Sequence, residues 1–193
     1  MQTTVSHPAY KSILRVALAT AILLLVPLVA MKFTDEVNWT GMDFAVAGAL
    51  LFGAGCAFVS LARRTGDIAS RLAAVTAVLA GLMLIWVNLA VGIIGSENNP
   101  ANLMYFGVVA VEIAGAFVAR MRPPGMARAL AATAMAQSLV AVVALVADMG
   151  AGEPPGRLGI LVLNGFFVAL FATSAWLFAR AARRHSVSEP SHG

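Results

Sequence analysis

The sequence predicts an all-α, polytopic integral membrane protein that crosses a bilayer as a bundle of six transmembrane helices. Three observations support this fold class. Hydrophobic residues make up 60% of the 193 residues and charged residues only 11%, whereas about a quarter of an average soluble domain is charged. The apolar residues gather in six long windows. The connecting segments are alternately rich and poor in arginine.

Each of the six windows approaches the ~20 apolar residues that a spanning helix needs. Polar residues do not recur at every turn within them, as they would in an amphipathic helix of a soluble protein. The windows are Ile13–Met31, Met42–Ala62, Leu72–Ile94, Asn102–Ala119, Ala127–Asp148 and Leu158–Ala181. We therefore expect a transmembrane domain over residues 12–184, with disordered cytoplasmic tails at 1–11 and 185–193.

The first window has an alternative interpretation. Lys11 and Arg15 precede its apolar stretch, as basic residues do in a signal peptide. The segment Leu28-Val29-Ala30 fits a small-x-small cleavage site poorly, so six helices remain the prediction. The segments between windows contain proline and glycine, for example Arg122-Pro123-Pro124-Gly125, which end helices where water can satisfy the freed backbone groups.

Basic residues predict the orientation in the membrane. When alternate connections are assigned to opposite sides, eleven basic residues fall on one side, and only Lys32 and Arg157 fall on the other. Because cytoplasmic loops carry the excess of lysine and arginine, both termini are expected in the cytoplasm, with the chain in the inner membrane. This distribution accounts for the net charge of +4 without a nucleic-acid partner, and membrane lipid is the expected partner. The eleven are Lys11, Arg15, Arg63, Arg64, Arg71, Arg120, Arg122, Arg128, Arg180, Arg183 and Arg184.

Two spacings recur with a period of about 57 residues and suggest three tandem helical hairpins. In the odd-numbered windows an arginine precedes a Thr-Ala pair by five residues, and in the even-numbered windows a glycine precedes an arginine by fifteen. The alternative is coincidence, because alanine and glycine are abundant and arginine is favoured at cytoplasmic helix ends. The pairs are Arg15 with Thr20, Arg71 with Thr76, Arg128 with Thr133, Gly48 with Arg63, Gly107 with Arg122, and Gly165 with Arg180.

Small residues at helical spacing predict close helix packing, since membrane helices associate where small side chains let backbones approach. The stripes are Ala45, Ala49, Gly53 and Ala57 in the second window, Ala73, Ala77 and Gly81 in the third, and Gly115, Ala116 and Ala119 in the fourth.

Glu112 is the candidate functional residue. It lies eight residues before Arg120, which at ~1.5 Å per residue places it near the middle of the bilayer. A charged carboxylate there costs about 2.5 kcal/mol or more, so Glu112 should face the bundle and be protonated, paired or wetted by a cavity. The neutral polar residues that could partner it are Gln137, Asn88, Asn164, Thr133 and Thr173.

Most enzyme classes find no support. The sequence contains no Gly-x-Ser-x-Gly, His-Glu-x-x-His or glycine-rich phosphate motif. The three histidines, His7, His185 and His192, lie in the tails, and the single Cys56 lies inside an apolar window. We therefore expect no enzyme activity, no catalytic residue, no cofactor and no metal site.

Two classes of function remain. The first is a small transporter or channel-like protein for a proton, cation or small solute, with Glu112 as the intramembrane site. The second is a non-catalytic membrane module that acts as a subunit of other membrane proteins or self-associates as a homo-oligomer. Transport predicts a water-accessible Glu112, whereas the module predicts a dry core in which Glu112 is hydrogen-bonded, for example to Gln137.

Overall fold

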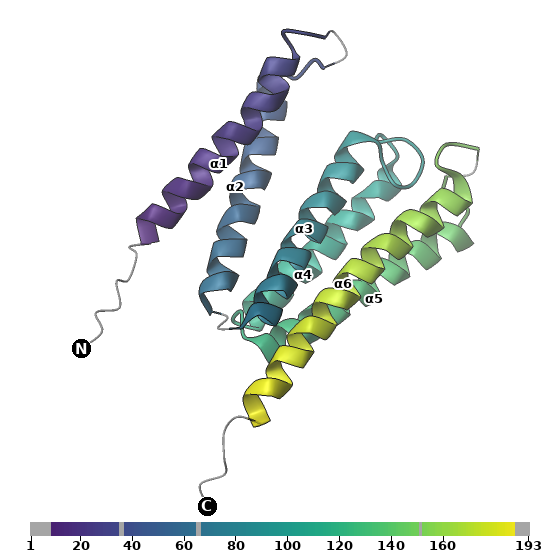
Figure 1. The fold of residues 1–193 in the computed structure, drawn as a ribbon. Coiled ribbons are helices and arrows are strands. Elements are labelled where there is room, and N and C mark those ends of the chain that lie inside the picture. The colour runs from purple at the N-terminus through teal and green to yellow at the C-terminus, as the bar shows by residue number, and fades with distance from the viewer. Residues whose placement is uncertain (1–8, 35–36, 65–66, 151, 188–193) are drawn as a thin grey trace, which may run out of the picture. The chain divides into compact units, whose positions relative to one another are not determined.

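A computed structural model describes residues 9–34, 37–64, 67–150 and 152–187 (Figure 1). The described residues form helices and connecting loops without a strand, which confirms the all-α prediction. All six helices are long and apolar enough to cross a membrane. They are α1 (Ala9–Ala30), α2 (Gly41–Arg64), α3 (Ile68–Ala90), α4 (Leu103–Val118), α5 (Pro123–Val146) and α6 (Gly156–Val187), with a short 3-10 helix, η1 (Pro100–Asn102), before α4.

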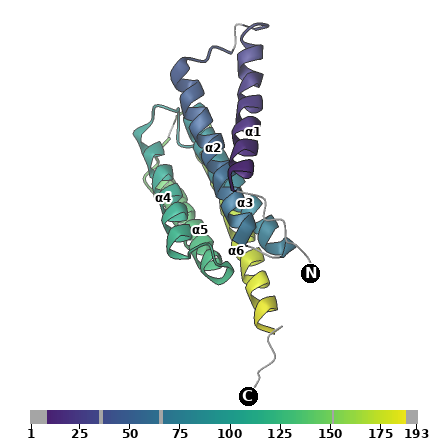
Figure 2. The same cartoon turned by 90° about the vertical axis from the view of Figure 1, so that its left-hand side faces the viewer.

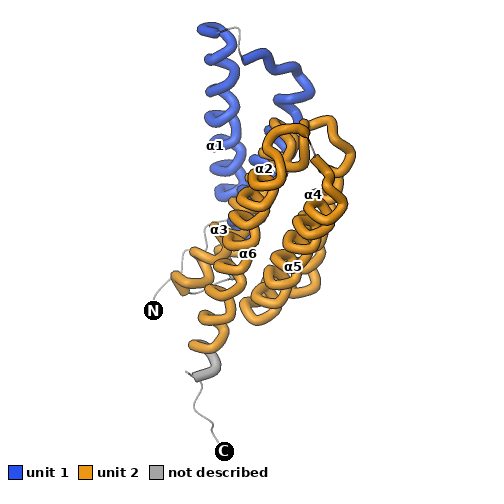
Figure 3. The backbone as a smooth tube through the Cα atoms, turned by 90° about the vertical axis from the view of Figure 1, so that its right-hand side faces the viewer, with its two compact units in different colours: residues 1–60 blue, residues 61–193 orange. Residues whose placement is uncertain are grey.

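The chain divides into two compact units, residues 1–60 and 61–193 (Figure 3). The first unit contains α1 and most of α2. Helix α2 begins with reciprocal hydrogen bonds, in which the Asp43 carboxylate accepts from the backbone and hydroxyl of Thr40 and the Asp43 N–H donates to that hydroxyl. The two helices approach each other at Gly55, where an added Cβ would lie 2.5 Å from Cγ1 of Val16.

The second unit contains a bundle formed by α3, α4, α5 and α6. Helix α6 packs along both α5 and α3, and α4 packs along α5 (Figure 2). The interface between α3 and α4 is smaller than these three. Phenylalanines of α6 fill the core beside the alanines of α3, because the small side chains leave room for aromatic rings. These core residues are Phe167, Phe171, Phe178, Ala73, Ala74, Ala77 and Ala80. The Ser174 hydroxyl joins the two helices by donating to the Ala73 carbonyl oxygen at 2.7 Å.

The observed helix bounds differ from the predicted windows where local hydrogen bonds decide them. Helix α3 begins earlier than expected because Asp67 caps it by accepting from the Ser70 N–H. It ends at Ala90 rather than Ile94, because Gly92 takes a left-handed φ of 74°. The apolar composition of Val91–Ile94 could not show this turn.

The tails are partly helical. Ala9–Lys11 begin α1 and His185–Val187 end α6, although the sequence analysis assigned both segments to disordered tails. Lysine and alanine are good helix formers, so α1 extends beyond its apolar window. The rest of the predicted tails, residues 1–8 and 188–193, lies outside the described residues.

The small-residue stripes have different outcomes. The stripes of α3 and α4 pack within the bundle, and an added Cβ at Gly115 would lie 2.7 Å from the Ala129 Cβ of α5. In α2, however, Ala45, Ala49 and Gly53 are exposed, and the approach to α1 uses Gly55 instead. Because α2 is hydrophobic on every face, the packed face could not be predicted from its sequence.

The proposed hairpin repeat stays a prediction. Its matching residues occupy different environments, because Arg63 and Arg180 lie inside helices whereas Arg122 lies beyond the end of α4. Helix α4 stops early because Arg120 and Met121 both adopt positive φ angles. Gly107 has open space where a Cβ would be, whereas Gly48 faces Leu24.

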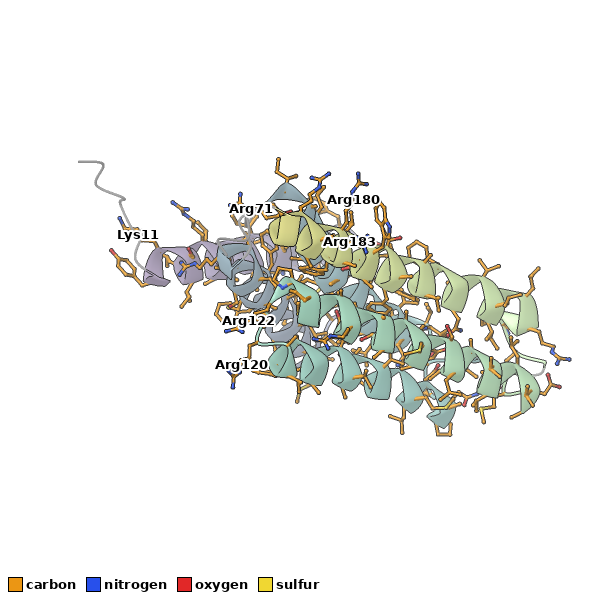
Figure 4. The ribbon with its side chains drawn as sticks, turned by 90° about the horizontal axis from the view of Figure 1, so that it is seen from below. Lys11, Arg71, Arg120, Arg122, Arg180 and Arg183 are labelled. Carbon is orange, nitrogen blue, oxygen red and sulfur yellow. The ribbon has the colours of Figure 1, made fainter. Side chains whose placement is uncertain are left out.

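Arginines gather at one end of the second unit, where α3 begins, α4 turns into α5 and α6 finishes. Figure 4 labels five of them, Arg71, Arg120, Arg122, Arg180 and Arg183. We call this the arginine-rich end. The opposite end is formed by the α3–α4 and α5–α6 loops, where Arg157 pairs with Asp148 at 3.5 Å, and we call it the loop end.

Candidate functional site

Glu112 lies on the face of α4 that turns into the second unit. Tyr105, Val108 and Val109 on the same face are buried, and the Glu112 side chain is itself half-buried. Val118, the last residue of α4, lies six positions after Glu112, a rise of about 9 Å along the axis. Glu112 is therefore in the interior of a membrane-length helix, as the sequence predicted.

Gly81 of α3 provides the surface against which the Glu112 carboxylate rests. A Cβ at Gly81 would lie 2.5 Å from Oε2 and 3.3 Å from Cδ of Glu112, so only glycine leaves room for the carboxylate in this position. The site thus lies between α3 and α4, at an interface smaller than those of α6 with α5, α6 with α3 and α4 with α5. Within the described part of the chain, Glu112 has neither a hydrogen-bond partner nor an ion-pair partner.

The packing of α4 on α5 gives the depth of Glu112 relative to the other polar residues. Gly115 contacts Ala129, and the two helices run in opposite directions. Glu112 lies about one turn from Gly115 toward the loop end, and Thr133 lies about one turn from Ala129 in the same direction, so Glu112 and Thr133 are at the same level. The Thr133 hydroxyl donates to the Ala129 carbonyl oxygen at 3.0 Å. Gln137 lies one further turn toward the loop end, about 6 Å along the axis.

A buried polar cluster joins three helices at the level of Gln137. Gln137 Nε2 donates to Oδ1 of Asn164 at 2.8 Å. The Asn164 amide also contacts the Tyr105 hydroxyl, donating to it from Nδ2 at 3.0 Å. All three side chains are at most 1% exposed. Oε1 of Gln137 is fully buried and has no partner among the described residues.

Asn88 belongs to a second polar cluster, at the loop end of α3. Its Nδ2 donates to the Asn102 carbonyl oxygen at 3.1 Å, while its Oδ1 is buried without a partner in the described residues. The Asn102 side chain accepts from the N–H groups of Ile93 and Ile94. It also donates to the carbonyl oxygens of Ile94 and Ser96, and so holds the α3–α4 loop in place.

The structure therefore brings together some of the predicted site residues and separates others. Gln137 and Asn164 are in direct contact, whereas Asn88 lies in the Asn102 cluster. The hydrogen bond between Glu112 and Gln137 suggested by the sequence is not formed. Thr173 is exposed, and its neighbour Ser174 is the residue that faces the core.

Tyr105 is a member of the polar cluster that was not among the site residues predicted from the sequence. A tyrosine near the end of a membrane helix is usually an interfacial anchor, but the Tyr105 side chain is 1% exposed and lies inside the bundle. The available signal was spacing, because Tyr105 precedes Glu112 by seven residues, two turns along the same helix face.

The arrangement offers oxygen ligands and one negative charge. A carboxylate can hold a proton or balance a single positive charge, and uncharged amide and hydroxyl oxygens can complete the coordination of a hard cation. The described residues do not place three acidic, histidine or cysteine side chains together as a metal site. Comparisons of the chain with protein-family models, with curated proteins and with solved structures find no match.

Proposed function

We propose that this multi-pass membrane protein is a small transporter or channel-like protein whose α3–α6 bundle passes a proton or a small monovalent cation by way of Glu112. The observation that supports the proposal is a carboxylate inside a membrane-length helix, resting on Gly81, without a protein partner in the described residues. The module hypothesis, in contrast, expects this carboxylate to be hydrogen-bonded.

The physical argument rests on the cost of an isolated charge. An unpaired carboxylate at membrane depth must be neutralised by a proton, by a cation or by water that reaches it. The position of Glu112 at the small α3–α4 interface supports exchange with a mobile ion, because less packing would have to separate there than at the other three interfaces. Gly81 has no side chain that could cover the carboxylate on the α3 side.

In the described bundle, Glu112 is the one acidic residue at this depth. Arg128 of α5 is the charged residue nearest to Glu112 in depth, because it is adjacent to Ala129, but its side chain is exposed. The remaining titratable groups on the packed helices lie two turns away or at the helix ends. They are Tyr105 on α4, Asp67 and Arg71 at the start of α3, and Arg157, Arg180, Arg183 and Arg184 on α6.

The arginine-rich end supports an orientation for transport. Because cytoplasmic ends carry the excess of arginine, we assign this end and both termini to the cytoplasm, and the protein to the inner membrane. Cations would then enter or leave through the loop end on the opposite side.

The test is ion flux in proteoliposomes that contain the purified full chain and an entrapped pH or cation indicator. The wild-type protein is expected to dissipate gradients of protons, sodium, potassium or methylammonium faster than empty liposomes. Glu112→Gln keeps the size of the side chain and removes its charge, so its flux should fall to the level of empty liposomes.

Glu97→Gln is the matched control, because it makes the same change at an exposed carboxylate of the α3–α4 loop, and it should retain wild-type flux. Wild-type flux at background for all four ions would contradict transport. Equal flux in the wild type and Glu112→Gln would contradict the role of Glu112.

A further inference from the structure

The unpartnered polar atoms of the bundle share one chemical property. Of the buried side-chain nitrogen and oxygen atoms that the structure describes, two have no hydrogen-bond partner, Oδ1 of Asn88 and Oε1 of Gln137. Both are acceptors, and the Glu112 carboxylate is a third unmatched acceptor when ionised. The described part of the bundle therefore has fewer hydrogen-bond donors and positive charges than these acceptors require.

The orientation of the Gln137 amide follows from its neighbours. Asn164 Nδ2 donates to the backbone carbonyl oxygen of Ile160 at 2.8 Å, and a carbonyl oxygen can only accept. Nδ2 of Asn164 must therefore face Ile160, and Oδ1 must be the amide atom that faces Gln137. Oδ1 in turn requires a donor from Gln137, which is Nε2 at 2.8 Å. Reversing the Gln137 amide would place two oxygens in contact, so Oε1 must be the unpartnered atom.

Asn88 is fixed in the same way. Its Nδ2 faces the backbone carbonyl oxygen of Asn102, which leaves Oδ1 as the atom without a partner. Two amides in different clusters thus present acceptor oxygens of fixed orientation. A backbone carbonyl oxygen orients Asn88 directly and orients Gln137 through Asn164. A buried acceptor without a donor destabilises the folded protein, so each is a position where a donor or a cation would be stabilising.

We infer that Oε1 of Gln137 is a further ligand of the cation that binds Glu112, one helical turn toward the loop end. This inference rests on the proposed function and specifies the transported ion as a small monovalent cation, which is either a metal ion or an ammonium-type ion. Acceptor oxygens coordinate such ions, whereas they repel anions. Gln137 is thereby a specificity-determining residue.

The experiment measures thermal unfolding of the full chain in detergent with sodium, potassium or methylammonium chloride, against choline chloride at equal concentration. A cation that binds the folded protein raises Tm, and at a given concentration the rise grows with the logarithm of the affinity. At least one small cation should raise the wild-type Tm above its value in choline, and replacing chloride by nitrate should leave that shift unchanged.

Two variants of Gln137 test the ligand directly. Gln137→Met keeps the length of the side chain but removes Oε1, and the apparent cation affinity should fall roughly tenfold or more. Gln137→Glu replaces the amide by an acid and should bind the cation at least as tightly as the wild type at alkaline pH. Ser138→Ala, which removes a hydroxyl bonded within α5 to Ala134, should retain wild-type affinity.

The outcomes separate this inference from the proposed function. Absence of a cation-specific shift in the wild type, or an equal shift in Gln137→Met, would overturn the role of Gln137, even if flux depends on Glu112. If the wild-type Tm shift is lost in Gln137→Met but wild-type ion flux is at background, the binding site is upheld and transport is rejected. If Gln137→Met fails to fold, a Gln137→Glu shift weaker than that of the wild type at alkaline pH overturns the inference.

Discussion

Two buried amides of the second unit, Asn102 and Gln137, differ in how completely their hydrogen bonds are satisfied, although each of their clusters contains one unmatched oxygen, on Asn88 and on Gln137. At the loop end, both side-chain atoms of Asn102 are matched, with two donors to Oδ1 and two acceptors for Nδ2. In the bundle interior, Gln137 keeps one unmatched oxygen, and Glu112 has no partner in the described residues. Asn102 and Gln137 are both buried, so burial alone does not distinguish these two amides.

The difference separates a structural polar site from a functional candidate. A fully bonded amide stabilises one conformation of the loop, because each bond replaces one that water made in the unfolded chain. An unmatched acceptor lowers stability unless a ligand completes it. Substitutions should therefore affect stability at Asn102 and ion movement at Glu112.

The largest effect on stability is expected for Asn102→Asp. The new carboxylate oxygen would face the carbonyl oxygens of Ile94 and Ser96, where Nδ2 now donates. Two lost hydrogen bonds and a buried negative charge should lower Tm in detergent by about 5–10 °C.

Asn99→Asp makes the same change in the same loop and provides the control. The Asn99 oxygen accepts from the Ala101 N–H as a helix cap, and aspartate can make this bond equally well. Its Tm should stay close to the wild-type value. Equal losses in the two variants would show that the bonds of Asn102 are not the cause.

Gly81→Ala should have a small effect on stability and a large effect on flux. Alanine favours the helix by about 0.5–1 kcal/mol, which offsets the local displacement of the Glu112 carboxylate. Because the carboxylate must move from its position on α3, ion flux in proteoliposomes should fall roughly tenfold.

Gly107→Ala is the matched control on α4, since an added Cβ there meets open space. It should change neither Tm nor flux appreciably. Unaltered flux in Gly81→Ala would mean that the position of the carboxylate against α3 is unimportant.

The sequence was sufficient for the features that depend on local composition. Six apolar windows predicted six helices of membrane length, and an acidic residue inside one window identified Glu112. Gln137 and Asn164 were also found, since polar side chains in apolar helices usually face protein. Their direct contact could not be predicted, because it depends on how α5 and α6 are rotated about their axes.

Features that depend on contacts distant in the sequence were missed. The segment from Ser96 to Asn102 resembles an ordinary turn in composition, yet Asn102 reaches back to Ile93 and Ile94 and determines how the chain leaves α3. Thr173 and Ser174 are equally polar, and only the packing of α6 on α3 shows that Ser174 is the buried one.

Infrared difference spectroscopy of the full chain in lipid, between acidic and alkaline pH, tests most directly whether Glu112 exchanges protons or cations with water. We expect the carboxylic acid carbonyl band of Glu112 to appear at acidic pH, to be lost at alkaline pH, and to be absent from the difference spectrum of Glu112→Gln. A wild-type spectrum identical to that of Glu112→Gln would contradict the central claim, because Glu112 would then be closed to exchange.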